Sequence, residues 1–469
     1  MAKIIVAGGG ICGSAAALML ARDGHEVTLF ERDDGPVPAS VEAAWADWNR
    51  RSVAQFRFAH ILLARGHGIL ARELPDVVDR LAASGGLHYN AVDNMLRGIA
   101  GATRRPDDAR FDTVTGRRSS IEWALATTLT EEPNVTVRRG SVISGLVAGP
   151  MAIPGVPHVT GVRLADGEVV NADLVVDATG RRSPTPEWVT DLGGQAPAEV
   201  AEDSGFTYIG RFFRSADGST PSIRAPILSP LGSISILCIP SDNGTWATTL
   251  YAASSDAPMR RLRDPEVFER VIRACPLHAH WLDGEPISEI SSMSGVVDRV
   301  RRFVVDDVPV VTGMLSIADA HACTNPSIGR GMTLGLMHTV VMRDAVRAHI
   351  DSSVELAKAF DAATVAEIDP WHAATRDLDR ARIAMMEAAA EGREIELGPA
   401  EKIGVALLAA TRFDEQSARW FDEIQQCLAF PMDVLSREGA LDRVLTVTAG
   451  TQPEPIPGPD RKRLLELVS

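Results

Sequence analysis

The chain has 469 residues, 45% of them hydrophobic and 23% charged, which suits two or three domains or one large interleaved α/β body. Its formal net charge of −15 disfavours non-specific binding to nucleic acid, which requires a basic face. The five cysteines are widely spaced and form no CxxC pair, so the sequence indicates neither a disulfide framework nor a zinc site, and we expect no bound metal. These features predict a cytoplasmic protein.

The first 32 residues combine an apolar run with three consecutive glycines. Lys3 to Ala7 is rich in β-branched residues and predicts a buried parallel strand, Ala15 to Arg22 predicts a helix, and Glu26 to Phe30 predicts a second strand. A secretory signal would keep its apolar middle uninterrupted, whereas Gly8 to Gly10 break this one. No later segment reaches the roughly eighteen uncharged apolar residues of a membrane span. The segment therefore predicts a βαβ unit.

Three glycines of this unit have the spacing GxGxxG. In such a motif the first glycine (Gly8) makes a tight turn, the second (Gly10) lets a pyrophosphate approach the backbone, and the third (Gly13) lets helix and strand pack closely. The helix N-terminus then offers free N–H groups to the phosphates. Glu31, at the end of the second strand, can accept hydrogen bonds from a ribose diol. The unit therefore predicts a dinucleotide site.

The middle of the chain changes from a buried strand to alternating patterns. Leu174 to Val176 predicts a further buried strand. Strand patterns then follow at Phe206 to Phe213, Ser233 to Ile239 and Thr245 to Tyr251, and Ser241 to Gly244 is a hairpin signal between the last two. We expect an antiparallel sheet, one face of which covers the bound cofactor.

A second glycine-containing block lies three hundred residues after the first. Pro309 to Thr312 predicts a short strand, Asp319 follows it, and a helix is expected from Met332 toward Ile350. The rest of the chain reads as helical, interrupted at Asp369-Pro370 and Gly398-Pro399. Residues 450–463 predict a proline-rich linker or extended tail.

An N-terminal GxGxxG paired with a late Asp, Pro and Gly block resembles the FAD-dependent monooxygenases of the p-hydroxybenzoate hydroxylase fold. Their relatives include squalene epoxidase, polyether epoxidases, flavin-dependent halogenases and geranylgeranyl reductases. The resemblance implies an α/β fold in which a Rossmann-type FAD-binding domain is interleaved with an antiparallel-sheet substrate domain and followed by C-terminal helices. The implied divisions are an FAD-binding part at 1–183, with 81–111 contributing to the substrate side, a substrate domain at 184–299, a return segment at 300–348 and a helical region at 349–469.

The resemblance also implies which residues hold FAD. Asp319 would hold its ribityl and pyrophosphate part, and the loop with Pro326 would lie beside the isoalloxazine ring. Ala318 stands where relatives usually have glycine, and His321 is one place early, so we expect it to be a structural histidine. The complete set of expected FAD-binding residues is Gly8, Gly10, Gly13, Glu31, Arg32, Arg51, Arg118, Val142, Asp319, Pro326, Gly329, Gly331 and Met332.

The source of electrons is indicated by the segment Asp177-Ala178-Thr179-Gly180. Hydroxylases that bind their own NADPH usually have Asp-Gly here, and Thr179 replaces that aspartate. The resemblance therefore implies that NAD(P)H acts indirectly, through a separate flavin reductase.

The reaction implied is hydroxylation or epoxidation of a small, largely apolar molecule by a flavin C4a-hydroperoxide formed from O2, in secondary metabolism. Halogenases carry Trp-x-Trp-x-Ile-Pro, whereas the corresponding place reads GSISILCIP from Gly232 to Pro240, which disfavours halogenation. No acid–base residue can be named from the sequence. Two alternatives stay open, a double-bond reductase of the geranylgeranyl reductase type and a non-enzymatic prenyl carrier of the GDP-dissociation-inhibitor type, as does the oligomeric state.

Overall fold

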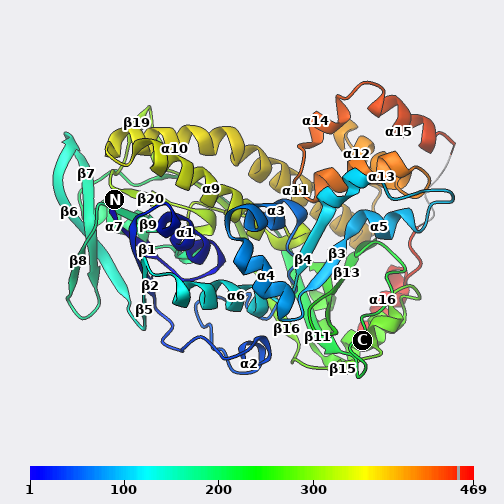
Figure 1. Cartoon of the computed structure of the whole chain (residues 1–469). Helices are drawn as coiled ribbons and strands as arrows, with labels where there is room; N and C mark the ends of the chain where they lie inside the picture. Colours follow the sequence, from blue (N-terminus) through cyan, green and yellow to red (C-terminus); the bar gives the residue numbers. More distant parts are fainter. Residues whose placement is uncertain (451–454) are drawn as a thin grey trace.

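The structure, a computed structural model, describes residues 1–450 and 455–469. A five-stranded parallel sheet forms its centre, in the order β20-β9-β1-β2-β5 (Figure 1). The strands are β1 (Lys3–Ala7), β2 (Glu26–Glu31), β5 (Val135–Arg139), β9 (Leu174–Asp177) and β20 (Met314–Ser316). The order joins the N-terminal βαβ unit to strands more than 140 and 280 positions away, so the domain that they build is discontinuous in sequence.

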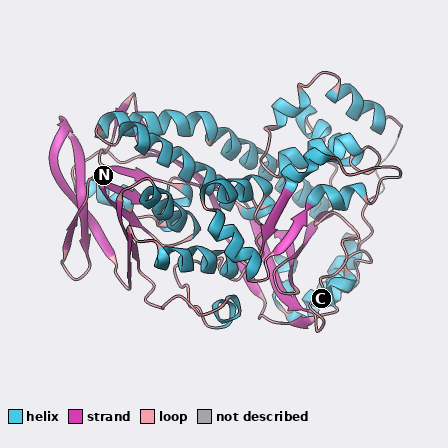
Figure 2. Cartoon of the chain, in the orientation of Figure 1, coloured by secondary structure: helices cyan, strands magenta, loops and turns pink. Residues whose placement is uncertain are grey.

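Apolar helices cover this sheet (Figure 2). Helix α1 (Ile11–Arg22) buries nearly all of its side chains, because alanines and leucines occupy every face. It packs against α6 (Arg118–Glu131) and α9 (Gly331–His349). The other helices on this side of the chain are α2 (Val41–Ala46), α3 (Ala64–Glu73), α4 (Pro75–Ala83), α5 (Ala91–Leu96) and α7 (Thr185–Asp191).

One predicted strand lies at a different place in the structure. The parallel strand of the late block is β20, not Pro309 to Thr312, since Val308–Pro309 (β19) pairs with Val304–Val305 (β18). Gly313, which lies between β19 and β20, has φ +72°, and a Cβ there would lie 2.1 Å from the carbonyl oxygen of Val159. Strand β6 (Ile143–Ile153) does not pair with β5; it pairs with β7 (Val156–Leu164), which pairs with β8 (Val169–Asn171).

The antiparallel sheet lies at the other end of the molecule, in the order β12-β13-β14-β11-β15. Asn243 and Gly244 both have positive φ in the turn between β13 and β14, as a tight hairpin requires. Strand β16 also pairs with β11, and β17 joins β10 and β21 in a smaller sheet. Its strands and neighbours are β10 (Ala198–Asp203), β11 (Phe206–Arg214), β12 (Leu228–Leu231), β13 (Ile234–Pro240), β14 (Thr245–Ala253), β15 (Glu285–Pro286), β16 (Ser291–Ser294), β17 (Val297–Arg302) and β21 (Ala322–Cys323). Helix α8 (Pro265–Arg273) and the short pair β3 (Leu87–Asn90) and β4 (Asp112–Thr115) flank it.

Helices make up the C-terminal region, as predicted. Helix α11 (Asp369–Glu391) runs from the parallel-sheet end toward the antiparallel sheet, where it contacts β14 (Figure 1). The remaining helices are α10 (Ser353–Glu367), α12 (Pro399–Ala410), α13 (Glu415–Gln425), α14 (Pro431–Leu435), α15 (Ala440–Thr448) and α16 (Arg461–Val468). Part of the predicted proline-rich tail, residues 451–454, lies outside the described residues, and its end, from Arg461, is helical.

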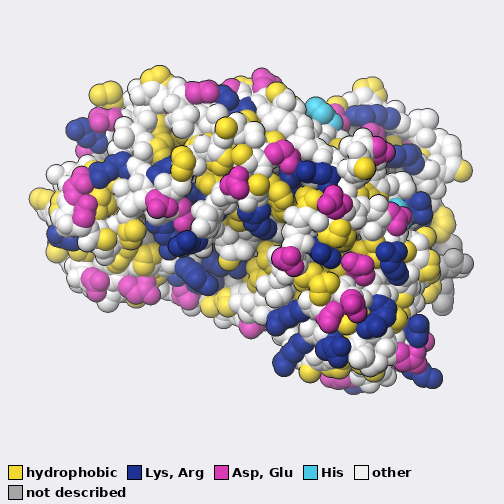
Figure 3. All heavy atoms as spheres, turned by 90° about the horizontal axis from the view of Figure 1, so that it is seen from below, with side chains coloured by type: hydrophobic (Ala, Val, Ile, Leu, Met, Phe, Trp, Pro, Cys, Tyr) yellow, Lys and Arg dark blue, Asp and Glu magenta, His cyan; other side chains and the backbone are white. Residues whose placement is uncertain are grey.

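Among residues 1–450 and 455–469, no helix combines the length and the apolar character needed to cross a bilayer. Acidic and basic side chains are interspersed on the face seen in Figure 3, together with scattered hydrophobic ones. The fold class predicted from the sequence, a Rossmann-type α/β sheet with a separate antiparallel sheet and C-terminal helices, is confirmed.

Candidate active site

One large cavity connects the glycine motif, the antiparallel sheet and the C-terminal helices. Its volume is about 2770 Å³, several times the usual range of roughly 300–1000 Å³ for a small-molecule pocket. Its walls include Gly10 from the start of α1, Asp319 from the late block and Tyr251 from β14. The cavity can therefore hold a dinucleotide and a further ligand together.

The three motif glycines have different surroundings. Gly8 has φ +104°, and a Cβ there would lie 2.5 Å from the carbonyl oxygen of Ala178. A Cβ on Gly13 would lie 2.0 Å from the carbonyl oxygen of Gly8. A Cβ on Gly10 would meet nothing within 4 Å, and Gly10 lines the cavity. Gly8 and Gly13 are thus required by packing, whereas Gly10 keeps space free in front of the helix N-terminus, where an anion is stabilised.

Glu31 is buried beside the glycine loop, and a buried arginine holds it there. The backbone N–H of Gly9 donates to Glu31 Oε2 at 3.1 Å, and Arg50 Nη2 lies 3.0 Å from the same oxygen. Arg50 also donates to the carbonyl of Gly9 at 2.9 Å and pairs with Glu122 at 3.2 Å. Arg50 was not predicted from the sequence. The predicted FAD-binding residue was its exposed neighbour Arg51, which also lines the cavity.

Arg32 and Val142 lie at the same end of the cavity. Both line it and both are exposed, Val142 in the loop between β5 and β6. Both belong to the predicted set of FAD-binding residues, and both lie where they can contact a ligand in the cavity.

Asp319 lies on the cavity wall, surrounded by cations. Burial raises the pKa of its carboxyl group, and the charges of Arg181, Arg118 and Arg299 oppose that rise. The preceding residue, Ala318, has φ +52°, a left-handed conformation that glycine would adopt at lower cost. Alanine is nevertheless accommodated at this position, where the resemblance implied glycine.

Two buried histidines pack against the segment that carries Asp319. The backbone N–H of Ala318 donates to His338 Nδ1 at 3.1 Å, and the His321 ring lies 4.9 Å from the His338 ring. His321 is 2% exposed, and burial lowers its pKa to about 3. It is therefore a neutral core residue and does not reach the cavity, in agreement with the structural role expected.

Arg118 occupies the first turn of α6 beside the half-buried His60. Its Nε lies 2.7 Å from Glu122 Oε1, and its Nη1 lies 3.3 Å from His60 Nε2. Burial, followed by the charge of Arg118, lowers the pKa of His60 to about 3. Helix α6 begins after Arg117, which makes no side-chain capping hydrogen bond.

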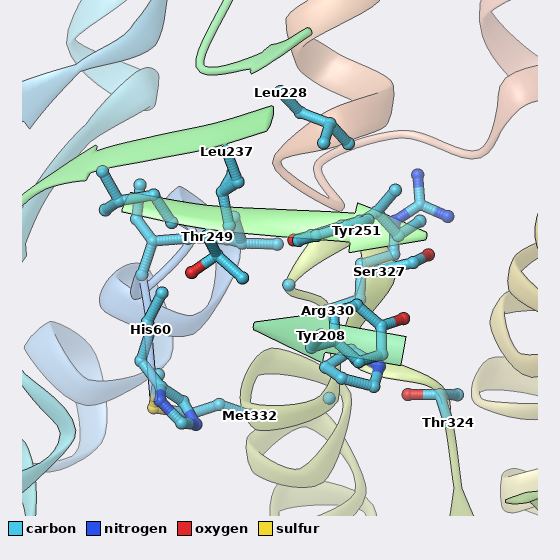
Figure 4. A pocket seen from close by; sticks show the side chains of 18 of the residues that line it. His60, Tyr208, Leu228, Leu237, Thr249, Tyr251, Thr324, Ser327, Arg330 and Met332 are labelled. Atoms are coloured by element: carbon cyan, nitrogen blue, oxygen red, sulfur yellow. The ribbon is translucent and has the colours of Figure 1, made fainter. Parts of the chain in front are cut away.

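The predicted ring-facing loop forms the floor of the cavity opposite β13 and β14. Gly329 has φ +71°, Gly331 begins α9, and both line the cavity with Pro326 and Met332. Figure 4 shows Leu237, Thr249 and Tyr251 projecting from the strands, with His60 and Met332 across the cavity from them. The loop and the sheet therefore face each other over a mostly apolar space.

Thr179 is exposed, lines the cavity and makes two hydrogen bonds to the buried side chain of Asp177. Its N–H and hydroxyl both donate to Asp177 Oδ1, at 2.9 and 2.6 Å. The other carboxylate oxygen of Asp177 accepts from Ser183 and Thr185. Thr179 therefore stabilises the end of β9, a role that the sequence alone did not reveal.

Comparisons with known proteins agree with this geometry. The family model of Glucose inhibited division protein A matches residues 3–189. Protein Rv3254 of Mycobacterium tuberculosis is 28% identical over 360 residues, 73% of each chain. Kynurenine 3-monooxygenase of Salinispora arenicola is 25% identical over 372 residues, 77% of this chain and 76% of the relative.

A solved structure extends the match to the three-dimensional level. PqsL of Pseudomonas aeruginosa, described as "a probable FAD-dependent monooxygenase", superposes with a TM-score of 0.59 at 17% identity, and the match covers 82% of this chain and 96% of PqsL. The chain has the fold of the FAD-dependent monooxygenases. The resemblance predicted from its sequence is confirmed, and so is its class as an FAD-dependent oxidoreductase.

The residues of this flavoprotein fold suit the cofactor. Gly10 leaves open the space that the pyrophosphate of FAD would take, and Glu31 is buried with its carboxylate at the end of β2. Arg118 and Arg181 supply positive charge near Asp319 and line the cavity. Two segments 300 positions apart, around Gly10 and around Asp319, thus line the same cavity.

Proposed function

We propose that the protein is a monooxygenase that hydroxylates or epoxidises a small, largely apolar organic molecule in secondary metabolism. The observation that carries this proposal is the single cavity that joins the open space at Gly10 to the apolar face of β13 and β14. A cofactor and a substrate can meet there without leaving the protein.

In this proposal FAD occupies the end of the cavity with the glycines. Gly8, Gly10 and Gly13 shape the site for its pyrophosphate, and Glu31 accepts hydrogen bonds from the ribose. The remaining contacts are proposed for Arg32, Arg51, Arg118, Val142, Asp319, Pro326, Gly329, Gly331 and Met332. Bound FAD, once reduced, would supply oxygen-transfer chemistry with O2.

The chain's own part is to bind the substrate and keep water away from the flavin ring. Leu228, Leu237 and Tyr251 line the cavity on the sheet side and favour an apolar or aromatic ligand (Figure 4). Excluding water protects a reactive intermediate from decay. The relative named kynurenine 3-monooxygenase supports an aromatic substrate of modest size.

We infer that electrons come from NAD(P)H through a separate flavin reductase, because Thr179 is committed to Asp177 and no aspartate stands in its place. We also place the protein in the cytoplasm, because all five of its cysteines are unpaired thiols.

The oxygen reaction of the flavin tests the proposal. The FAD-loaded protein is reduced chemically and mixed with aerated buffer, and its visible absorbance is followed. A monooxygenase predicts a transient absorbance that differs from both oxidised and reduced flavin before the oxidised spectrum returns. Slow reoxidation in one phase would favour the double-bond reductase, and a protein that stays colourless with FAD would favour the prenyl carrier.

A further inference from the structure

Helix α11 reaches the predicted ring-facing loop through one buried carboxylate. Asp379 is 1% exposed and accepts hydrogen bonds from Ser327 Oγ and, at 3.2 Å, from Asn325 Nδ2. These two residues flank Pro326. A side chain from the C-terminal helical region therefore holds the loop on both sides of its proline.

The hydrogen bonds continue from this carboxylate to the antiparallel sheet. Asn325 Oδ1 accepts from the hydroxyl of Tyr208 at 2.6 Å, and the Asn325 N–H donates to Asp298 Oδ1, also at 2.6 Å. The Tyr208 ring lies 4.6 Å from the Tyr251 ring, and both tyrosines line the cavity. Loop, helix and sheet are thus connected through Asn325.

The carboxylate of Asp379 fixes which groups in this network donate hydrogen bonds and which accept them. An ionised carboxylate only accepts hydrogen bonds, so Asp379 fixes the amide of Asn325 with its NH2 toward the helix and its oxygen toward Tyr208. The Tyr208 proton is then committed to Asn325, and its oxygen remains available only as an acceptor. If Asp379 took up a proton, it could donate, and the constraint on the loop would be relaxed.

We propose that Asp379 is a positioning residue that sets the ring-facing loop, so that its ionisation changes the surroundings of the flavin. The inference rests on the proposed function only in placing the FAD ring beside this loop. It gives the C-terminal helices a part in the site, which the proposed function alone does not assign.

The charged and titratable groups that face Asp379 are Arg382, Asp298, Tyr208 and Tyr251. Burial raises the pKa of Asp379 to about 6, opposed by the hydrogen bond from Ser327 and the charge of Arg382 on the same helix. Asp298 faces it from β17, and burial also raises the pKa of that carboxyl group. Burial raises the pKa of Tyr208 on β11 and of Tyr251 on β14, so both tyrosines stay neutral.

The test follows the visible absorbance and fluorescence of bound FAD in the holoprotein as the pH is varied around 6. Wild type should show a spectral transition near that pH. Asp379→Asn should remove it, while Glu387→Gln should keep it, since Glu387 is a carboxylate of the same helix that bonds Ser255 instead. Ser327→Ala should raise the midpoint by roughly one pH unit, because a donor to the ionised form is lost.

Each outcome decides the matter. Bound FAD without a wild-type transition, or a transition that survives Asp379→Asn, overturns the inference and leaves the proposed function standing. If Asp379→Asn does not fold, Ser327→Ala decides, and an unchanged midpoint counts against the inference. A wild-type protein that binds no FAD would instead overturn the proposed function.

Discussion

Arg117 and Asp242 form a fully buried ion pair between the FAD-binding part of the chain and the antiparallel sheet. The distance between Arg117 Nη2 and Asp242 Oδ2 is 2.7 Å. Arg117 precedes α6, and Asp242 lies in the hairpin turn between β13 and β14. Burial opposes ionisation of Asp242, but the hydrogen bonds and charge of Arg117 lower its pKa. The backbone N–H of Arg117 and the hydroxyl of Ser120 donate to the same carboxylate. The pair fixes the antiparallel sheet over the cavity.

Removing this charge should destabilise the protein strongly. Asp242→Asn leaves the buried Arg117 guanidinium with only the partly exposed carboxylate of Glu42 as a counter-charge, and breaking a buried pair costs roughly 3–5 kcal/mol in free energy of unfolding. Urea denaturation followed by circular dichroism measures the change. Glu168→Gln, which breaks an exposed pair with Arg138, is the control and should leave the denaturation midpoint nearly unchanged. Equal effects of the two substitutions would contradict this reading.

Buried histidines should make the fold sensitive to acid. Burial lowers the pKa of His321 to about 3 and that of His372 to about 4, and it lowers the pKa of His338 as well. Because these pKa values are depressed, their contribution to stability is present above the unfolded pKa of about 6.5 and is lost as the pH falls through the folded values. The denaturation midpoint should therefore decrease between pH 6.5 and 4.

Replacing His321 should reduce that pH dependence. Neither of its ring nitrogens has a hydrogen-bond partner within the described ranges, so His321→Leu removes a titrating group without breaking a bond. Unfolding is measured across the same pH range. The control is His88→Leu on the exposed surface of β3, which should leave the slope as in wild type. An unaltered slope in His321→Leu would show that other groups cause the acid sensitivity.

NADPH alone should reduce the bound flavin slowly, and a separate flavin reductase should accelerate the reduction at least about tenfold. The reason is that Thr179 faces Asp177 through two hydrogen bonds and offers no carboxylate to a nicotinamide cofactor. Stopped-flow absorbance under nitrogen measures both rates. Fast reduction by NADPH without a reductase would refute the external-reductase proposal.

The N-terminal βαβ unit was predictable because its signals are local. The strand, the glycines and the helix occupy 20 consecutive residues, and the structure gives β1 and β2 the predicted bounds to within one residue. The strand of the late block was misplaced, because its position depends on a contact between Gly313 and Val159 that the sequence does not display.

The site was predictable where a motif carries it and not where tertiary contacts do. Gly10 and Asp319 were identified from spacing and from a family resemblance. Arg50 was missed because its two neighbouring carboxylates, Glu31 and Glu122, are 19 and 72 positions away in sequence. Asp379 was missed for the same reason, since its partners in the loop lie more than 50 positions earlier.

The central claim is that the segments around Gly10 and Asp319 hold one FAD between them. Titration of the FAD-free protein with FAD, read by flavin fluorescence, tests it most directly. Gly10→Leu fills the open space at the helix N-terminus and Asp319→Asn removes the carboxylate, and each should weaken FAD binding at least about tenfold. The control Gly145→Val lies on β6, where a Cβ meets nothing within 4 Å, and should bind FAD as wild type does. Wild-type affinity in both Gly10→Leu and Asp319→Asn, with unchanged circular dichroism, would contradict the account.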